Sequence, residues 1–218
     1  MLAASVVPSE CPIVRTVDRN FRQALWSSTG DRSCAMNIVT RTLVASVDWA
    51  ALRTDSGSGT GLVRAFEDLS TAASEESSRN AYWRIDNEVI VQGELYEAAV
   101  PALEVLLSMA PTAPPGPVRR SLAELVQQIT FGQPRGSEIE LGNTDLATRC
   151  LALASEATWI FYGWLTDDDS DVRECALLTL QKVDSNEARK GIVFAACRAA
   201  DSTPGVQRSL SEIERGLL

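Results

Sequence analysis

The hydrophobic positions of this chain recur at helical spacing from about residue 47 to residue 218. Segments long enough for an α-helix alternate there with short linkers rich in Gly, Ser, Thr and Pro. Apolar residues at i, i+3, i+4 and i+7 form one stripe on a helix, and such a stripe is normally buried against another element. A β-branched run stands at 87–92 (NEVIVQ) between two helix-like patterns, and strand signals are otherwise nearly absent. The pattern therefore predicts an all-α protein.

Two linkers separate predicted helices. The first, APTAPPGP at 110–117, holds four prolines and cannot be helical throughout. Pro117 suits the first turn of the next helix, because an N–H at that position has no helical partner to lose. The second, FGQPRGSEIELGN at 131–143, is the longest irregular stretch of the second half. We expect a protruding loop there, with Glu138 and Glu140 at the surface as candidate partner-binding residues.

The chain also contains an internal repeat. Three segments, at 100–129, 158–183 and 190–217, each consist of an apolar helix, a polar or Pro-rich break, and a second helix that opens on valine. A weaker unit lies at 62–85, and an additional helix is expected at 144–157. A helix pair of this size cannot bury its own stripe, so the units must stack on one another. The second helices align in four columns: Val118, Val172 and Val206; Leu122, Ala176 and Leu210; Leu125, Thr179 and Ile213; and the small residues Ser121, Cys175 and Ser209.

Residues 1–45 show no sustained stripe, although Phe21, Leu25 and Trp26 could share one face of a helix. The segment also lacks the basic start and continuous apolar core of a secretory signal. We therefore divide the chain into a loosely specified N-terminal extension, residues 1–45, and a repeat domain, residues 46–218.

The segment LTDDDSDVRECALLTL, at 165–180, resembles the second half of a HEAT repeat, in which an acidic turn and a D-x-D-x-x-VR-x-x-A-like pattern open the inner helix. The stretch at 86–107 (DNEVIVQGELYEAAVPALEVLL) is similar to the matching part of bacterial HEAT-repeat proteins. The stretch at 38–69, with Trp49, is similar to their first segment. The resemblance covers about 47–218 and implies a right-handed α-solenoid of stacked HEAT-like helical hairpins.

The same resemblance implies a function. The usual role of such solenoids is protein binding, and some relatives are encoded beside toxin genes and act as immunity proteins. The most concrete expectation is therefore an immunity-type inhibitor of a cognate, basic toxin. The alternative is a scaffold or assembly chaperone of the HEAT-repeat type, including bilin-lyase-like proteins. A HEAT-type DNA-repair glycosylase is a third class, and it would need a basic concave face.

An alternating set of aspartates raises the question of a calcium site. Asp167, Asp169 and Asp171 match the first, third and fifth positions of an EF-hand loop. That loop also needs glycine at its sixth position and glutamate at its twelfth, which are Val172 and Leu178 here. We therefore expect no metal at this segment.

The better interpretation of these aspartates is a turn between two packed helices. Asp171 or Ser170 could cap a helix that begins at Val172, and carboxylates near a helix N-terminus oppose the positive end of its dipole. Turns of this kind lie at the edge of a stack, so the acidic residues are also candidate docking charges. These candidates are Asp167, Asp168 and Asp169.

The segment ATWIFYGWL, at 157–165, is apolar on nearly every side and is expected in the middle of the stack. Trp159 and Tyr162 point away from its main stripe, so they are candidate interface anchors, because Trp and Tyr dominate binding hot spots. Tyr96 and Trp83 are weaker candidates of the same kind.

The net charge and the residue types present argue against several classes of function. The formal net charge is −9, and residues 81–218 account for −8 of it. The sequence has no basic run, which argues against nucleic acid as a ligand, whereas a basic protein partner is electrostatically compatible. The chain has no histidine, which removes the commonest general base and zinc ligand. We expect no enzymatic activity and no cofactor.

The five cysteines stand singly, at 11, 34, 150, 175 and 197. Cys175 and Cys197 fall in helix-like apolar patterns and are interpreted as small reduced core residues, which favours a cytoplasmic location. No window approaches 18 consecutive apolar residues, so we expect no membrane association through a spanning helix.

Overall fold

The structure, a computed structural model, describes residues 36–217 and is mostly helical. Eleven α-helices, α2 to α12, lie in this range together with three short 3-10 helices and a small sheet. The predicted all-α class is confirmed at this level. Phe21, Leu25 and Trp26 lie outside the described residues.

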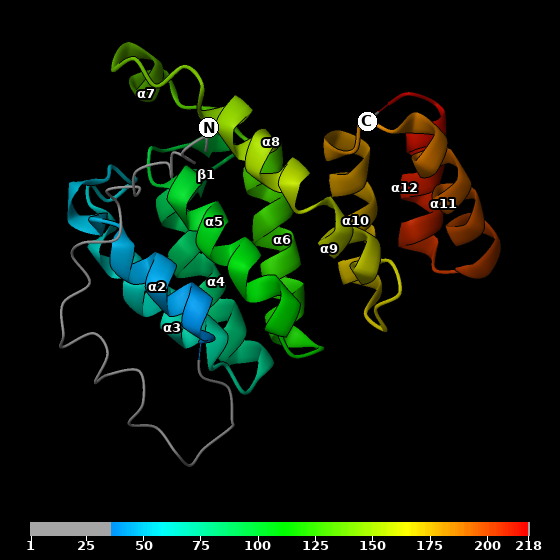
Figure 1. The fold of residues 1–218 in the computed structure, drawn as a ribbon, viewed down its shortest axis with the longest axis horizontal. Helices are drawn as coiled ribbons and strands as arrows, with labels where there is room; N and C mark the ends of the chain where they lie inside the picture. Colours follow the sequence, from blue (N-terminus) through cyan, green and yellow to red (C-terminus); the bar gives the residue numbers. More distant parts are fainter. Residues whose placement is uncertain (1–35, 218) are drawn as a thin grey trace, which may run out of the picture. The chain divides into compact units, whose positions relative to one another are not determined.

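Four helices pack side by side in chain order, each against the next (Figure 1). They are α4 (Glu75–Val89), α6 (Pro117–Phe131), α10 (Ser170–Val183) and α12 (Pro204–Glu214). Five of the remaining helices lie against this row: α3 on α4, α5 and α8 on α6, α9 on α10, and α11 on α12. Their bounds are Ile38–Ser46 for α2, Leu62–Ser70 for α3, Ala99–Met109 for α5, Leu146–Glu156 for α8, Thr158–Trp164 for α9 and Glu187–Ala200 for α11.

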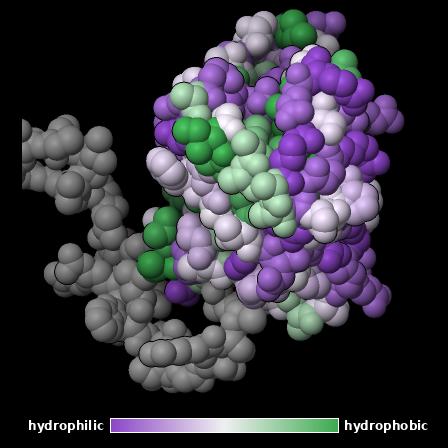
Figure 2. Space-filling model, turned by 90° about the vertical axis from the view of Figure 1, so that its right-hand side faces the viewer, coloured by the Kyte–Doolittle hydropathy of each residue, from purple (hydrophilic) through white to green (hydrophobic). Residues whose placement is uncertain are grey.

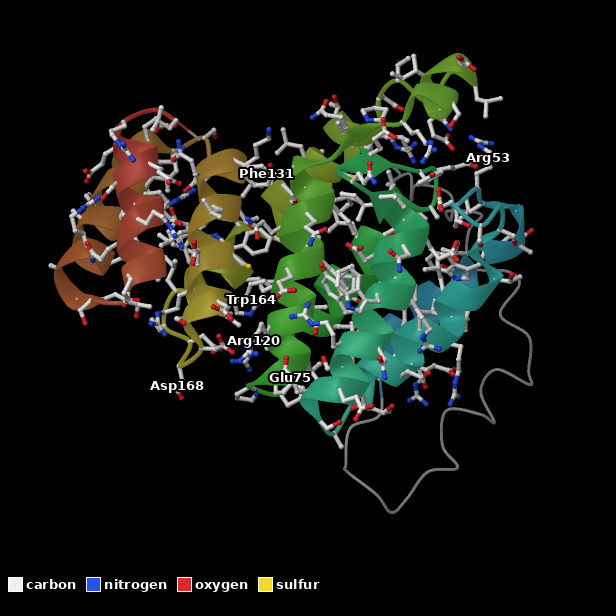
Figure 3. All side chains as sticks on the ribbon, turned by 180° about the vertical axis from the view of Figure 1, so that it is seen from behind. Arg53, Glu75, Arg120, Phe131, Trp164 and Asp168 are labelled. Carbon is white, nitrogen blue, oxygen red and sulfur yellow. The ribbon has the colours of Figure 1, made fainter. Side chains whose placement is uncertain are left out.

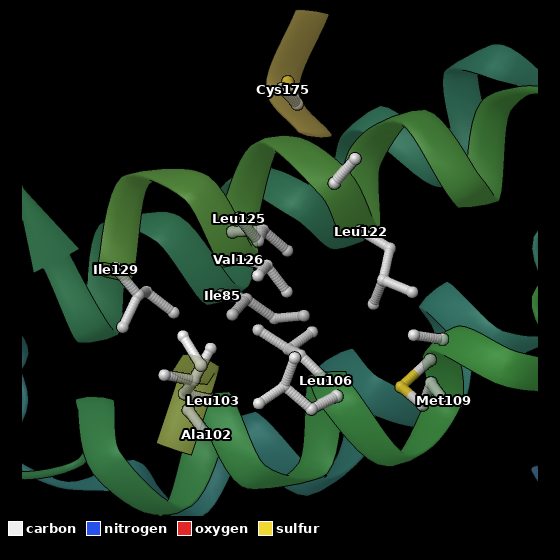
Figure 4. Close-up of a cluster of buried hydrophobic side chains, with 14 of the residues drawn as sticks. Ile85, Ala102, Leu103, Leu106, Met109, Leu122, Leu125, Val126, Ile129 and Cys175 are labelled. Carbon is white, nitrogen blue, oxygen red and sulfur yellow. The ribbon is translucent and has the colours of Figure 1, made fainter. Parts of the chain in front are cut away.

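The predicted columns lie in the core of the helical unit. All twelve column residues are buried except Ile213, which is half-buried against the core. Figure 4 shows Leu122 and Leu125 of α6 facing Ile85 of α4 and Leu106 of α5. The small column residue Ser121 lets α6 approach α4 closely, and its hydroxyl lies 2.9 Å from that of Ser78. Local spacing therefore predicted this part of the core correctly.

The linkers confirm one prediction and correct another. Pro117 is the first residue of α6, as expected. Helix α10, however, begins at Ser170, and its cap is Asp169, whose carboxylate accepts the backbone N–H of Asp171 at 2.9 Å. The predicted start at Val172, capped by Asp171 or Ser170, was two residues late. The reason is that Val172 is the first buried residue of α10, so the hydrophobic pattern reveals the stripe and not the first turn.

The β-branched run forms part of a small three-stranded sheet. Strand β1 (Ile90–Val91) pairs antiparallel with β2 (Glu94–Leu95) through a two-residue turn, and β2 pairs parallel with β3 (Gln133–Pro134). The turn residues Gln92 and Gly93 have φ values of 53° and 81°, the conformation favoured in tight hairpins.

The expected loop at 131–143 is partly regular. It holds β3 and a short helix, α7 (Gly136–Glu140), that stands away from the neighbouring helices (Figure 1). The sheet anchors the loop, because β3 is hydrogen-bonded to β2.

Helix α2 belongs to the helical unit. It packs against α5, and Thr40 and Val44 are its buried residues. Asn37 caps it and also donates from its amide Nδ2 to the carbonyl of Ser108. The contacts of α2 therefore extend this unit N-terminally past the predicted boundary at residue 46. None of the helices within residues 36–217 is both long and apolar enough to cross a membrane.

Candidate functional site

Arginines join the turns of successive helix pairs. The Nε of Arg173 lies 2.6 Å from Oδ2 of Asp201, in the turn between α11 and α12. The same guanidinium donates to the carbonyls of Asp167 and Asp168, in the turn before its own helix, at 2.7 and 3.0 Å. Arg173 therefore fixes one turn relative to the next.

The same link recurs along the row. Arg119 donates to the carbonyl of Ala113 in the turn before its own helix and to Oδ2 of Asp167 in the next, at 2.6 and 2.5 Å. Gln207 makes the first of these two contacts, because it donates to the carbonyl of Asp201 in the turn before its own helix. Each of these three residues follows a column valine, so the repeat extends from packing to polar contacts.

These links account for most of the aspartate cluster. The side chain of Asp167 is buried on Arg119, and Asp169 pairs with Arg120 at 2.6 Å. Burial alone would raise the pKa of Asp169, but hydrogen bonds from Arg120 and from the backbone N–H of Asp171 outweigh it and lower the pKa. Two of the three predicted docking charges, Asp167 and Asp169, are therefore already paired with arginines of the same chain.

Asp168 is different. Its side chain is exposed at the tip of the turn before α10 (Figure 3), and among residues 36–217 it has no ion-pair partner. Within the same range, no cluster of three or more His, Cys, Asp or Glu side chains is arranged to hold a metal ion.

A groove of about 650 Å³ lies between the pair α9–α10 and the pair α11–α12. Its walls are mainly apolar, and Cys197 lies among them, half-buried. At one end it is bordered by Asp168, Asp201 and Ser202, and Tyr162 also lines it. The main apolar residues are Leu165, Leu177, Ile192, Val193, Ala196 and Val206.

An aromatic and charged cluster lies beside this groove. Trp159 is 70% exposed, and its ring centroid is 5.4 Å from that of Tyr162. The guanidinium of Arg189, on α11, lies 5.1 Å from the Trp159 centroid and 5.6 Å from the Tyr162 centroid. Asp184 holds this arrangement, because it accepts from Arg189 at 2.6 Å and from the Tyr162 hydroxyl at 2.5 Å.

The charges of the cluster are coupled. The hydrogen bonds from Arg189, followed by that from Tyr162, hold the pKa of Asp184 far below its ordinary value despite some burial. Burial and the hydrogen bond to Asp184 raise the pKa of Tyr162. Asp184 therefore stays ionised and keeps Arg189 over the two rings.

Helix α11 has an uncovered apolar face. It buries Lys190 and Phe194, whereas Ile192 is 74% exposed. Ala195 and Ala196 are also exposed. Figure 2 views the molecule from the side on which α11 lies in Figure 1 and shows apolar side chains gathered among hydrophilic ones. Exposed apolar surface of this kind beside an aromatic anchor is characteristic of binding sites.

The other predicted residues lie elsewhere. Glu138 is buried, because Oε2 is 2.8 Å from Nη2 of Arg53 and accepts from Asn143 at 2.6 Å. These hydrogen bonds outweigh desolvation and lower the pKa of Glu138. Its predicted surface position was wrong, whereas Glu140 is exposed as expected. Figure 3 shows Arg53 near α7, well separated from Asp168.

Tyr96 is also buried, and its hydroxyl is held between Asp55 and Arg135. Burial, with the hydrogen bond to Asp55, raises its pKa to about 12. Trp83 is half-exposed on α4 and contacts Tyr82 edge-on. Of the predicted residues, Tyr162, Asp167 and Asp168 therefore line one groove, and Trp159 lies beside it against Tyr162.

Sequence reasoning missed Arg189, Asp184 and the exposure of Ile192. A signal for Asp184 was present: Asp167, Asp184 and Asp201 each accept the backbone N–H two residues further on, at the start of a turn before a helix. The spacing Asp-x-polar thus marks three successive turns. The stacking of Arg189 on Trp159 has no comparable local signal, since the two are 30 residues apart.

Three of the five cysteines lie within the described residues, at 150, 175 and 197. Cys150 and Cys175 are buried and free, and burial raises the pKa of both to about 12. Burial also raises the pKa of Cys197. Thiols of this kind are poor nucleophiles.

No protein-family model, no curated protein and no solved structure matches this chain. The geometry of the groove and its surroundings is therefore the basis for the functional inference.

Proposed function

We propose that this chain is a non-catalytic protein-binding module, built as a right-handed α-solenoid of HEAT-like helical hairpins. The ordered row α4, α6, α10 and α12 supports this architecture. So do the polar links that Arg119, Arg173 and Gln207 make at equivalent positions of successive units. Repeated units that contact their neighbours in the same way give a stiff surface suited to binding.

The observation that carries the binding role is Trp159. Its indole is largely exposed, yet Arg189 and Tyr162 hold it in place beside an apolar groove. A fixed, exposed tryptophan beside uncovered apolar surface loses little conformational entropy on binding and is a typical hot spot.

The partner is a basic protein. The chain carries a net charge of −9, and at one end of the groove Asp168 presents an exposed carboxylate that has no ion-pair partner among residues 36–217. Complementary charge accelerates encounter and orients the partner more than it adds affinity. The free cysteines at 150, 175 and 197 favour a reducing, cytoplasmic compartment.

The most specific form of this proposal is an immunity-type inhibitor that covers the active site or substrate cleft of a cognate toxin. The alternative is a scaffold or assembly chaperone. The groove supports this alternative only as far as protein binding in general. Its bilin-lyase-like version needs a reactive thiol or a carboxylate at a pigment groove. Cys197 lies in the groove, but its raised pKa works against thiolate formation, which leaves the carboxylates of Asp167, Asp168 and Asp201 there.

Co-expression with the protein encoded by the adjacent gene tests the proposal. We expect a stable 1:1 complex in size-exclusion chromatography with light scattering, and no co-purified pigment absorbance. Trp159→Ala should reduce its recovery, whereas Trp83→Ala, which removes an exposed indole from α4, should not. Absence of any complex, or equal effects of the two variants, would argue against a binding role for this face.

A further inference from the structure

We infer that the groove between α9 and α11 takes an amphipathic α-helix of the partner, antiparallel to α9 and α11, with basic residues at its N-terminal end. This inference rests on the proposed function and names the kind of segment that the groove binds.

The shape of the groove suits a helix. On α11 its lining residues recur at helical spacing as Ile192, Val193, Ala196 and Ala200. At 1.5 Å per residue this stripe is about 12 Å long, or about two turns. Ala196 and Ala200 are small, so a second helix can approach the backbone of α11 and insert its larger apolar side chains toward Leu177.

The two helices that border the groove run in the same direction. Arg189, near the start of α11, stacks on Trp159, near the start of α9. At the other end Arg173 binds both the turn that follows α9 and Asp201, which follows α11. The groove therefore has one end at the helix starts and one at the helix ends.

These two ends differ in charge. At the helix ends stand the exposed Asp168, the pair Arg173–Asp201, and the C-terminal carbonyls of α11, which carry the negative end of its dipole. Two further pairs near this end are each neutral: Asp167 with Arg119, and Arg198, in the last turn of α11, with Glu214. At the helix starts, the charge of Arg189 is neutralised by Asp184. The potential is therefore negative at the Asp168 end.

A bound helix that is antiparallel to α11 places its own N-terminus, the positive end of its dipole, at Asp168. Lys or Arg in or just before its first turn can reach the Asp168 carboxylate. Its apolar stripe then covers Ile192, and its flank packs on Trp159. The reverse direction would set two negative helix ends against each other.

A second copy of this chain is a poorer occupant. An antiparallel α11 would offer Arg189 and Lys190 to Asp168. Arg189 is already bound to Asp184, and Lys190 is buried, with its amino group 2.8 Å from Glu187. Neither is free to neutralise Asp168, so charge complementarity favours a different, basic partner.

A displayed library of 16-residue amphipathic helical peptides tests the inference against the full 218-residue chain. Each peptide keeps Leu at i, i+3, i+4 and i+7 and varies Lys, Gln and Glu in its first and last turns. We expect enrichment of peptides with Lys in the first turn. The affinity of the best peptide, from fluorescence anisotropy, should fall more than about tenfold in Ile192→Asp and about threefold in Asp168→Asn. Ile139→Asp, which changes an exposed isoleucine on α7, should leave it unchanged.

Several results would overturn the inference. The first is that no peptide of the library is enriched, and the second is that peptides with Lys in the last turn are enriched. The third is that the best peptide binds Ile192→Asp and Ile139→Asp with equal affinity. A dimer of the chain alone that Ile192→Asp converts to a monomer would assign the groove to a second copy. Peptide binding that rises at least about tenfold in Phe21→Asp/Leu25→Asp would assign it to residues 1–35. If peptides fail while the adjacent-gene complex still depends on Trp159, only the helical occupant is excluded and the proposed function stands.

Discussion

Arg173 and Asp201 form an ion pair of 2.6 Å that ties the turn before α10 to the turn before α12. Both side chains are largely buried, at 17% and 15% exposure. Because Arg173 also binds the carbonyls of Asp167 and Asp168, this one guanidinium sets the separation of two helix pairs, and with it the width of the groove between them.

Arg173→Met should therefore destabilise the protein. It leaves Asp201 without its counter-charge and removes the donors of two carbonyls, a loss of about 2–4 kcal/mol in the free energy of unfolding. Urea denaturation measures this change. Arg64→Met is the matched control, because Arg64 is 72% exposed and its surface pairs contribute at most about 0.5 kcal/mol. Similar losses in the two variants would contradict the role of Arg173.

The ion pair between Arg173 and Asp201 also predicts that the stability of the protein depends on pH. Hydrogen bonds from Arg173 lower the pKa of Asp201 to about 2, below its ordinary value of 3.8. A carboxyl whose pKa is lower in the folded state stabilises the fold above its unfolded pKa, and this stability is lost as pH falls through the folded pKa. Stability should thus fall between about pH 4 and pH 2, with Asp184 and Glu138 adding to the loss.

Asp201→Asn isolates the contribution of this one carboxyl. The variant should be less stable than the parent at pH 6, and the difference should shrink toward pH 2. Urea denaturation from pH 2 to pH 6 measures both curves. A constant difference across this range would show that Asp201 titrates normally in the folded protein.

Two glycines should respond to alanine in opposite ways. A Cβ at Gly132 would lie 2.5 Å from Leu95 Cδ2 and 3.0 Å from Ile90 Cδ1, so Gly132→Ala should cost about 1–3 kcal/mol and loosen the small sheet. A Cβ at Gly163, within α9, would meet nothing within 4 Å, so Gly163→Ala should stabilise by about 0.5–1 kcal/mol. Thermal unfolding distinguishes these signs, and a stabilised Gly132→Ala would refute the close packing of β2.

Glu138→Gln should loosen the segment around α7. The substitution removes the charge that binds Arg53 from a buried position, so we expect a loss of about 1–3 kcal/mol and faster amide hydrogen exchange across 136–143. Glu140→Gln changes an exposed glutamate of the same helix and should leave exchange unaltered. Equal exchange in the two variants would mean that Glu138 does not anchor this segment.

Local spacing was sufficient to predict the columns of the inner helices. Val118, Val172 and Val206 are buried because each begins an apolar stripe, and this depends on residues within one or two turns. The first turn of α10 was missed because Ser170 and Asp171 are polar and unburied, so they add nothing to the apolar stripe. Glu138 was missed because Arg53, which buries it, lies 85 residues earlier in the chain.

The exposure of the apolar stripe that lines the groove could not be predicted from local residue spacing either. Ile192 and Ala196 belong to a helical stripe that resembles a core stripe, but α11 packs on α10 and α12 through other residues and leaves this stripe uncovered. Trp159 was identified correctly as lying off the main stripe. Its stacking on Arg189, which makes it a fixed anchor, arises only when two helices come together.

The most direct test of the binding face compares dissociation constants for the complex with the adjacent-gene protein by isothermal titration calorimetry. Loss of a hot-spot side chain costs at least about 2 kcal/mol, so Trp159→Ala should weaken the complex at least about thirtyfold. Trp83→Ala should change the constant by less than about threefold. Unchanged affinity in Trp159→Ala, or a greater loss in Trp83→Ala, would contradict the assignment of binding to the face formed by α9 and α11.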